Sequence, residues 1–172
     1  MNLADYNNPL LTTPLEFIEE LEKDIEGLKE LSKQMYQLVA QFGGAGLSAN
    51  QIGINKRMFV VKYGEYEQTF INPKITWFSD KNIVLEEGCL TFPGVFIGVK
   101  RPDACRVTFM DADGNEHEEM LFTGISNRII QHEYDHMEGK FYYDHISKLQ
   151  MDRLKRKMKK KLGINLENTS SK

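Results

Sequence analysis

The sequence IIQHEYDHMEG, residues 129–139, contains the pattern H-E-x-x-H. On a helix, residues four apart lie on one face with about 5–6 Å between their Cβ atoms, so His132 and His136 are placed to bind one metal ion. Glu133 is offset beside this pair, where its carboxylate reaches a water molecule without being a ligand itself. The apolar residues before the motif predict a buried helix, and Gly139 is a suitable end for it.

The residues after the motif exclude the common sources of a third ligand. A metzincin protease continues to a third histidine, and Tyr142 stands at that position. A thermolysin-like enzyme needs a downstream glutamate, whereas the carboxylates after residue 139 are Asp144, Asp152 and Glu167, the last two in a basic segment and a polar tail. The third ligand is therefore expected upstream. Two chance histidines on a polar helix face are the simple alternative.

Length and composition indicate one globular domain, expected over residues 1–172. Of the 172 residues, 41% are hydrophobic and 27% charged, which is typical of a protein with a substantial core. No apolar run approaches the ~20 residues that span a bilayer, and the first eleven residues show no signal-peptide pattern. We therefore expect a cytoplasmic protein with no membrane partner. Its two cysteines, Cys89 and Cys105, do not form a disulfide framework.

Hydrophobic periodicity divides the chain into a helix, a group of strands and two further helices. Thr13 to Glu16 has the pattern of a capping box, and apolar residues then recur every three or four positions to about Gln41. Short strands are expected at 57–62, 66–71, 75–78, 82–86, 94–100, 105–111 and 117–122, with turns at Asn72-Pro73 and Asp113-Gly114. A helix at 125–137 and a basic helix from about Ser147 to Lys161 follow, before a polar, flexible tail at 163–172.

This order of elements predicts an α+β fold. No helical segment interrupts the strands, which favours antiparallel sheets over a parallel α/β core. We expect these sheets to pack around a central HExxH helix, with one long N-terminal helix and one C-terminal helix.

Two upstream segments carry residues suited to binding chemistry. The small residues 43–46 end the first helix and allow the backbone to approach a ligand closely, and Gln51 offers an amide donor in the same place. A phosphate-binding loop is disfavoured, because no Lys-Ser/Thr follows the glycines and no strand precedes them. Cys89 lies between a strand and a Pro-Gly turn, a position for a ligand or a reactive thiol. Cys105 lies in an alternating strand and is expected in the core.

Three blocks stand in order along the chain: GAGLSANQ at 44–51, EGCLT at 87–91 and QHEYDH at 131–136. Together they resemble the three signatures of the peptide deformylases, G-x-G-φ-A-A-x-Q, E-G-C-L-S and Q-H-E-x-D-H. The ordered set is specific, and the resemblance covers roughly residues 14–160. It implies an α+β enzyme that hydrolyses the N-formyl group from the N-terminal formylmethionine of new polypeptides and releases formate.

The resemblance also implies roles for single residues. One divalent metal ion per chain is expected, with water as its fourth ligand and three protein ligands, Cys89, His132 and His136. Family members commonly use Fe²⁺ and accept Ni²⁺, Co²⁺ or Zn²⁺. By the same match Glu133 is the general base, Gln51 and the Leu90 backbone N–H polarise the substrate carbonyl, and three residues contact the substrate: Ala45, Gly46 and Glu87.

The departures from the signatures are small. Thr91 replaces a serine and Ser48 replaces an alanine, and neither change removes a ligand or the base. Around the site, Asp135 and Gln131 are candidates for orienting the ligands, and Arg101 is a candidate for pairing with Glu87. The alternative for these residues is a surface or capping role.

Two other functions fit parts of the pattern. HExxH alone fits a peptide-bond metalloprotease, which Tyr142 and the missing downstream ligand disfavour. The Cys-His-His set fits a structural zinc site, but such sites are usually closed by a fourth protein ligand. The spare candidates for that ligand lie in strands or turns without ligand spacing: His117, His145 and Cys105.

A basic segment near the C-terminus suggests a partner. Residues 151–161 hold seven Lys/Arg and one Asp, a local charge of +6, so the rest of the chain carries −9 against a total of −3. A thin apolar edge is expected to dock this helix on the domain: Leu149, Leu154, Met158 and Leu162. Bacterial deformylases that end in a basic helix resemble this chain, and that helix is thought to dock near the ribosomal exit tunnel. The resemblance therefore implies two partners, formylmethionyl nascent peptides and the ribosome surface, and we expect the protein to be a monomer. A solvated helix kept basic for solubility is the alternative.

Overall fold

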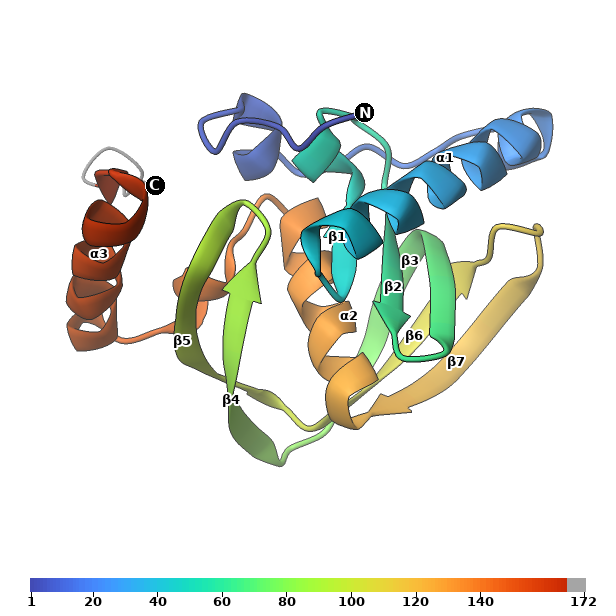
Figure 1. The fold of residues 1–172 in the computed structure, drawn as a ribbon. Coiled ribbons are helices and arrows are strands. Elements are labelled where there is room, and N and C mark those ends of the chain that lie inside the picture. The colour runs from blue at the N-terminus through green and yellow to red at the C-terminus, as the bar shows by residue number, and fades with distance from the viewer. Residues whose placement is uncertain (167–172) are drawn as a thin grey trace.

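The computed structural model describes residues 1–166 and contains two antiparallel sheets (Figure 1). One sheet has five strands in the order β1-β2-β3-β6-β7, and the other has two, β4 and β5. The strands are β1 (Gly46–Ser48), β2 (Met58–Tyr63), β3 (Tyr66–Phe78), β4 (Asn82–Cys89), β5 (Phe92–Pro102), β6 (Ala104–Met110) and β7 (Glu116–Thr123). Because β1 and β7 are the outer strands of the first sheet, each leaves one edge unpaired within it.

The helices lie between and outside these sheets. They are α1 (Leu21–Phe42), α2 (Gly124–Met137) and α3 (Lys148–Leu162), with short 3₁₀ helices η1 (Pro9–Thr12), η2 (Ala49–Ile52) and η3 (Tyr142–His145). Figure 1 shows α2 in the centre, between the five-stranded sheet and the β4–β5 pair, with α1 across β1 and β2 and α3 on the outer side of β5. Antiparallel sheets therefore surround a central HExxH helix, which confirms the predicted α+β fold.

Two apolar clusters hold this arrangement together. The larger one joins α1, the five-stranded sheet and the apolar side of α2, with fully buried residues such as Leu28, Phe70 and Ile130. The smaller one joins β5, η3 and α3, and it includes Phe92, Tyr142 and Cys89. The metal-ligand motif thus lies where the two clusters meet, because α2 closes the first and Cys89 belongs to the second.

The first helix begins later than the sequence pattern predicts, since α1 starts at Leu21 and the capping box predicted at residues 13–16 does not form. The backbone before α1 is instead bonded to other elements. The Leu15 N–H donates to the Met137 carbonyl at 2.7 Å, and Ile18 exchanges two hydrogen bonds of 2.9 Å with the Asn72 side chain. These long-range bonds replace the helical ones, and no local sequence pattern announces them.

One further expectation about the sheets was wrong, and one strand was missed. Asn72-Pro73 is not a turn between strands but an irregularity within the continuous strand β3, where the register shifts between Ile71 and Lys74 and Asn72 takes a left-handed conformation (φ 47°). Strand β1, only three residues long, was not predicted. It pairs with β2 from Gly46↔Val61 to Ser48↔Phe59 and brings the first signature block into the sheet.

The chain after α3 is partly packed. Gly163 ends the helix in a left-handed conformation, and Ile164 and Leu166 are buried in the smaller cluster, so the predicted flexible tail was wrong for residues 163–166. Its remainder, 167–172, lies outside the described residues. Among residues 1–166, no helix is both long and apolar enough to span a membrane.

Candidate metal centre and active site

Three ligand side chains converge at the centre of the molecule. Helix α2 presents His132 and His136 on one face, with ring centroids 5.0 Å apart, and β4 ends at Cys89. Their ligand atoms all lie within 4.8 Å of one another, and the Cys89 Sγ is 3.2 Å from His136 Nε2. All three side chains are buried. Among the described residues, this is the one group of three or more His, Cys, Asp and Glu side chains with the spacing of a metal site.

A register shift in the β4–β5 pair aims Cys89 at the helix. The two strands pair regularly from Asn82↔Pro102 to Glu87↔Ile97, then skip to Cys89↔Phe92. Such an irregularity bends a strand and redirects its side chains. Burial alone would raise the pKa of the Cys89 thiol, but His136 and His132 outweigh this and hold it well below its ordinary value. A thiolate is therefore favoured at the position of the third ligand.

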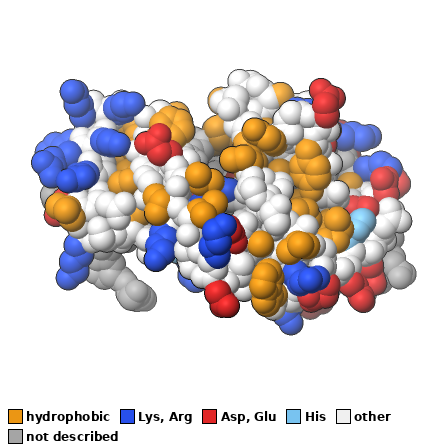
Figure 2. Space-filling view, turned by 90° about the horizontal axis from the view of Figure 1, so that it is seen from below, with side chains coloured by type: hydrophobic (Ala, Val, Ile, Leu, Met, Phe, Trp, Pro, Cys, Tyr) orange, Lys and Arg blue, Asp and Glu red, His pale blue; other side chains and the backbone are white. Residues whose placement is uncertain are grey.

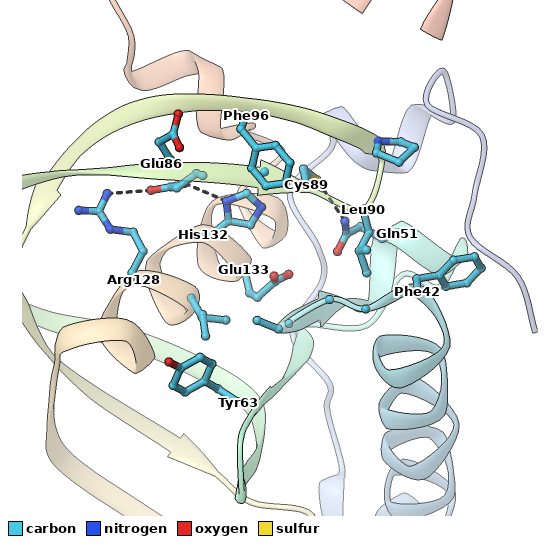
Figure 3. Close-up of a pocket in the computed structure, with 18 of the residues that line it drawn as sticks. Phe42, Gln51, Tyr63, Glu86, Cys89, Leu90, Phe96, Arg128, His132 and Glu133 are labelled. Atoms are coloured by element: carbon cyan, nitrogen blue, oxygen red, sulfur yellow. Dashed lines mark hydrogen bonds and ion pairs between the residues drawn. The ribbon is translucent and has the colours of Figure 1, made fainter. Parts of the chain in front are cut away.

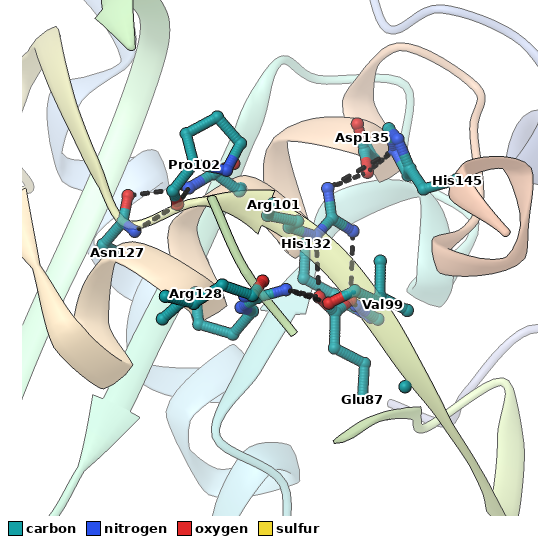
Figure 4. Close-up of polar contacts among 12 residues, drawn as sticks. Glu87, Val99, Arg101, Pro102, Asn127, Arg128, His132, Asp135 and His145 are labelled. Atoms are coloured by element: carbon teal, nitrogen blue, oxygen red, sulfur yellow. Dashed lines mark hydrogen bonds and ion pairs between the residues drawn. The ribbon is translucent and has the colours of Figure 1, made fainter. Parts of the chain in front are cut away.

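The Glu87 carboxylate anchors His132 from behind (Figure 4). Its Oε2 lies 2.9 Å from His132 Nδ1, which leaves Nε2 of that ring for a metal ion. Arg101 donates to Oε1 at 2.7 Å and to Oε2 at 3.0 Å, and Arg128 donates to Oε1 at 2.8 Å. Burial would raise the pKa of Glu87, but hydrogen bonds from His132 and Arg101 hold it well below its usual range. The Glu87 carboxylate is thus ionised, and each of its two oxygens takes part in two hydrogen bonds.

Residues around this anchor take the places expected of supports. The predicted pairing of Arg101 with Glu87 is confirmed, and Arg101 also donates to Asp135 Oδ2 at 2.6 Å. Asp135 lies 2.7 Å from His145 as well, while Gln131 donates to the Pro102 carbonyl at 2.9 Å. Neither Asp135 nor Gln131 contacts a ligand side chain in these bonds, so their influence on the metal centre passes through Arg101 and the fold of α2.

Arg128 is the residue of this network that the sequence analysis missed. Besides Glu87, its guanidinium donates to the backbone carbonyls of Val99 and Ile83, both at 2.9 Å, and so joins α2 to β4 and β5. An arginine directly before Ile129 and Ile130, in a helix expected to be buried, was the available signal. A buried cation requires acidic or carbonyl partners, and Glu87 was the carboxylate already predicted near the site.

Glu133 faces the ligands from α2 (Figure 3). It is buried, and its Oε2 has no hydrogen-bond partner among the described residues. Burial raises the pKa of Glu133 to about 7. A Cβ added at Gly46 would lie 2.6 Å from the Glu133 Oε1, so the glycine of β1 is what lets this carboxylate fit beside the strand.

Gln51 and the residues after Cys89 lie beside the Cys89 ligand (Figure 3). The Ser48 backbone N–H donates to Gln51 Oε1 at 2.9 Å, which turns the amide nitrogen toward Cys89 Sγ at 3.4 Å and Thr91 Oγ1 at 3.2 Å. Thr91, which replaces the serine of the signature, therefore keeps a hydroxyl contact. Leu90 follows Cys89 at the strand end and lines the same space.

A cavity of about 380 Å³ opens onto these groups. It is lined by Cys89, His132 and Glu133, by Ala45 and Gly46 at the start of β1, and by the end of β4. Large exposed apolar side chains surround it: Phe42, Tyr63, Phe96 and Ile125. Glu87 also lines this cavity, but its oxygens are engaged as described above. Its predicted contact with substrate stays a prediction.

The donor set fits a divalent transition metal. One thiolate and two imidazoles favour ions such as Fe²⁺, Co²⁺, Ni²⁺ or Zn²⁺ over Mg²⁺ or Ca²⁺. The unpaired Glu133 Oε2 beside the ligands is a buried acceptor that needs a partner, as expected where a water molecule belongs. The spare ligands of a closed zinc site are engaged elsewhere: His117 contacts Asp111 at 2.8 Å, His145 contacts Asp135, and Cys105 is buried in the sheet.

Cys105 is a core residue, as predicted. It is fully buried in the larger cluster, and burial raises the pKa of its thiol to about 12. A neutral thiol in apolar surroundings is inert. Only one of the two cysteines therefore has the environment of a ligand.

A buried three-ligand site with a free carboxylate beside it, at the base of an open cavity, is the arrangement of a metal-dependent hydrolase. The sequence matches the family described as polypeptide deformylase over residues 1–152, so the chain belongs to this family. It is 36% identical over 164 residues to the peptide deformylase of Cytophaga hutchinsonii, covering 91% of this chain and 87% of that protein. The chain is thus a hydrolase that removes the N-formyl group from the N-terminal formylmethionine of new polypeptides.

Solved structures agree with this assignment. Peptide deformylase 1B from Arabidopsis thaliana, in complex with an inhibitor, superposes with a TM-score of 0.81 at 32% identity, over 98% of this chain and 97% of that one. A peptide deformylase from Synechococcus elongatus in complex with actinonin gives a TM-score of 0.84 at 30% identity, over 92% and 85%. The fold of this chain is therefore the fold of the family along most of its length.

Proposed function

We propose that Cys89, His132 and His136 bind one divalent metal ion, and that the cavity above them takes the formylated end of a peptide. The observation that carries this proposal is the convergence of three buried ligand atoms beside an unpaired carboxylate. When bound, the ion supplies Lewis-acid chemistry, which acidifies a water molecule and polarises a carbonyl group. We assign Fe²⁺ as the native ion, with Ni²⁺, Co²⁺ or Zn²⁺ able to replace it, as the resemblance to the family implies. A thiolate with two imidazoles suits all four of these ions.

Glu133 acts as the general base of the reaction. Its free Oε2 accepts a proton from the attacking water and passes it to the amine that leaves. Gly46 allows the carboxylate to stand close against β1, so its position is fixed by packing as well as by the helix. Geometry supports this assignment. Glu133 lies close to both histidines but is not one of the three side chains whose ligand atoms converge.

Gln51 and the Leu90 backbone N–H stabilise the negative charge that develops on the formyl oxygen. Ser48 holds the Gln51 amide with its nitrogen facing Cys89. Donors fixed before the reaction are worth about 2.7–4 kcal/mol each in sites of this kind. The base and the donors thus come from separate segments, α2 for Glu133 and residues 51 and 90 for the donors.

The peptide backbone binds between two free strand edges. The cavity is flanked by Ala45 and Gly46, at the start of β1 with its unpaired edge, and by residues 86–90 at the end of β4, whose one partner among the described strands is β5. A peptide that enters as an extended strand satisfies the open backbone groups of such edges. Ala45 and Gly46 therefore contact substrate through their backbone, and the role we assign to Glu87 is to hold His132 in place.

Formate release tests this function. Protein loaded with Fe²⁺ or Ni²⁺ without oxygen is expected to release formate from a formyl-Met-Ala-Ser peptide and to leave the same peptide intact when its N-terminus is acetylated. Cleavage of an internal peptide bond, or no formate from metal-loaded protein, would contradict the proposal. Mass spectrometry of the products separates these outcomes.

We further propose that the enzyme works as a cytoplasmic monomer and meets its nascent substrates at the ribosome through α3. All the site residues come from a single chain. Lys and Arg side chains gather over α3 at one end of the molecule (Figure 2), which is the charge that RNA phosphate attracts. The smaller apolar cluster and β5 hold the opposite face of α3 on the body.

A further inference from the structure

Asn50 connects three segments beneath the metal centre. It is fully buried, and its Nδ2 donates to the backbone carbonyl of His136 at 2.6 Å and to that of Leu10 at 3.2 Å. The N-terminal segment and the end of the metal-ligand helix are therefore held by one side-chain amide. The His136 Nδ1 has no partner among the described residues. His136 thus lacks the ring-nitrogen anchor that Glu87 gives to His132.

Two backbone carbonyls fix which way this amide points, and the Ser48 hydroxyl satisfies its oxygen. Two carbonyl groups can accept hydrogen bonds but cannot donate them, so the amide nitrogen of Asn50 must face His136 and Leu10. Its oxygen then faces the Ser48 Oγ, 2.7 Å away, and the hydroxyl must be the donor. Ser48 is also fully buried. An alanine, which the family signature has at this position, would leave the Asn50 oxygen buried without a partner.

The same residue orients the amide of Gln51. The Ser48 backbone N–H donates to Gln51 Oε1 at 2.9 Å, while its hydroxyl donates to Asn50. One amide nitrogen then faces Cys89 and the other faces the His136 carbonyl. We propose that Ser48 and Asn50 form a brace that positions His136 relative to Gln51, with Ser48 as the positioning residue that this chain has in place of alanine. The proposal deepens the proposed function and rests on it.

The brace is tested by Ser48→Ala against a matched control. Ser32 is also buried, and its hydroxyl donates to the Leu28 carbonyl at 2.8 Å within α1, away from the site. In Co²⁺-loaded protein, Ser48→Ala is expected to lose the metal to a chelator about tenfold faster than wild type, with a changed Co²⁺ absorption spectrum. Its kcat falls while KM stays the same. Ser32→Ala lowers the melting temperature but leaves the spectrum, the rate of metal loss and kcat unchanged.

A double variant separates a brace from two independent contacts. Once Asn50→Ala has removed the amide, the Ser48 hydroxyl has nothing to orient, so Ser48→Ala/Asn50→Ala is expected to lose metal no faster than Asn50→Ala. The brace is overturned if the double variant loses metal at a rate that multiplies the two single effects. It is also overturned if Ser48→Ala behaves like Ser32→Ala. If Ser48→Ala does not fold, the double variant is expected to fold. Its failure to fold while Asn50→Ala folds overturns the brace as well.

The outcomes for the brace and for the proposed function are distinct. Wild-type and Ser32→Ala proteins that bind Co²⁺ yet release no formate from a formyl-Met peptide would contradict the proposed function. Active wild-type protein with equal metal loss from Ser48→Ala and Ser32→Ala would contradict the brace alone.

Discussion

Helices α2 and α3 are nearly equal in length but are held in opposite ways. Nine of the fourteen residues of α2 are buried, whereas only Leu154 and Met158 are buried among the fifteen of α3. Six of the buried residues of α2 are polar, and contacts such as Arg128 to Glu87 and Gln131 to Pro102 fix them from several directions. A helix held from several directions is rigid, and a metal centre requires rigid support for its ligands.

Helix α3 is attached along one side only. Gln150, Lys157 and Lys161 donate to the carbonyls of Gly98, Phe96 and Gly94, which are alternate residues on the free edge of β5. The helix thus covers an edge that would otherwise be open to another strand. Because one face supplies all of these contacts, the other face keeps its charge in solvent. The difference indicates that α2 is held rigidly for chemistry, and it leaves the exposed face of α3 available for the ribosome contact that we propose.

The largest effect is expected from the ligands, because without them α2 has no metal to position. Cys89→Ala, His132→Ala and His136→Ala should each lose bound metal and activity together, as measured by metal analysis and formate release. Cys105→Ala is the matched control, a buried thiol outside the site, and it should keep both. A full equivalent of metal in Cys89→Ala would remove the thiol from the ligand set.

Glu133→Gln should separate metal binding from turnover. The substitution keeps the volume that packs against Gly46 but removes the base, so the metal content should stay at one equivalent while kcat falls by about 10²–10⁴-fold. Metal analysis and kcat are measured on the same preparation. If metal content falls in proportion to kcat, Glu133 is a ligand and the role assigned to it is wrong.

The ease of prediction differed between these regions for physical reasons. HExxH needs only helical spacing, which is local, so α2 and its ligand pair follow directly from the sequence. The basic helix is also a local pattern, and its bounds and its buried Leu154 and Met158 agree with the structure, but Leu149, placed on the same apolar edge, is exposed. An apolar stripe on a helix predicts which side faces the protein, but not how far along the helix the contact with the protein extends.

Contacts between distant segments account for what the sequence did not reveal. The start of α1 depends on hydrogen bonds from Leu15 to Met137 and from Ile18 to Asn72. The Arg128 contacts depend on the position of β4 and β5 next to α2, and Cys89 was placed as a ligand because a family signature marks it. In each case the partner is separated from the residue by dozens of positions, and periodicity carries no information at that range.

The Glu87 anchor should show an intermediate effect. Arg128→Met removes one cation from the buried carboxylate and two hydrogen bonds that join α2 to the β4–β5 pair. We expect metal affinity to fall by about 10–100-fold and the free energy of unfolding by about 3–5 kcal/mol, the usual effect of breaking a buried ion pair. Metal titration and urea unfolding measure the two quantities.

Arg106→Met is the control for that experiment, because Arg106 is exposed and its guanidinium contacts only the Glu119 carbonyl among the hydrogen bonds of the described residues. It should leave both quantities unchanged within error. If Arg128→Met lowers stability but leaves metal affinity at the wild-type value, Arg128 supports the fold and not the ligand.

The smallest effect on catalysis is expected from the outer face of α3. Arg153, Arg156, Lys159 and Lys160 are exposed and hold no β5 carbonyl, so changing all four to Gln leaves the attachment of the helix intact. Activity on a short formyl-Met peptide should stay within about twofold of wild type, since surface substitutions of this kind rarely disturb a distant site. Salt-sensitive cosedimentation with ribosomes should be strongly reduced.

The control for this last variant must change the charge equally at other places. Lys33, Lys74, Lys81 and Lys140 are exposed and lie outside α3, so changing these four to Gln gives the same net charge. If α3 binds phosphate directly, the α3 variant reduces the salt dependence of binding by about one unit for each phosphate that it no longer neutralises, and the control variant does not. Equal reduction of cosedimentation in the two variants would mean that overall charge attracts the enzyme to ribosomes. Retention of binding in the α3 variant would leave the helix with one role, as the cover of the β5 edge.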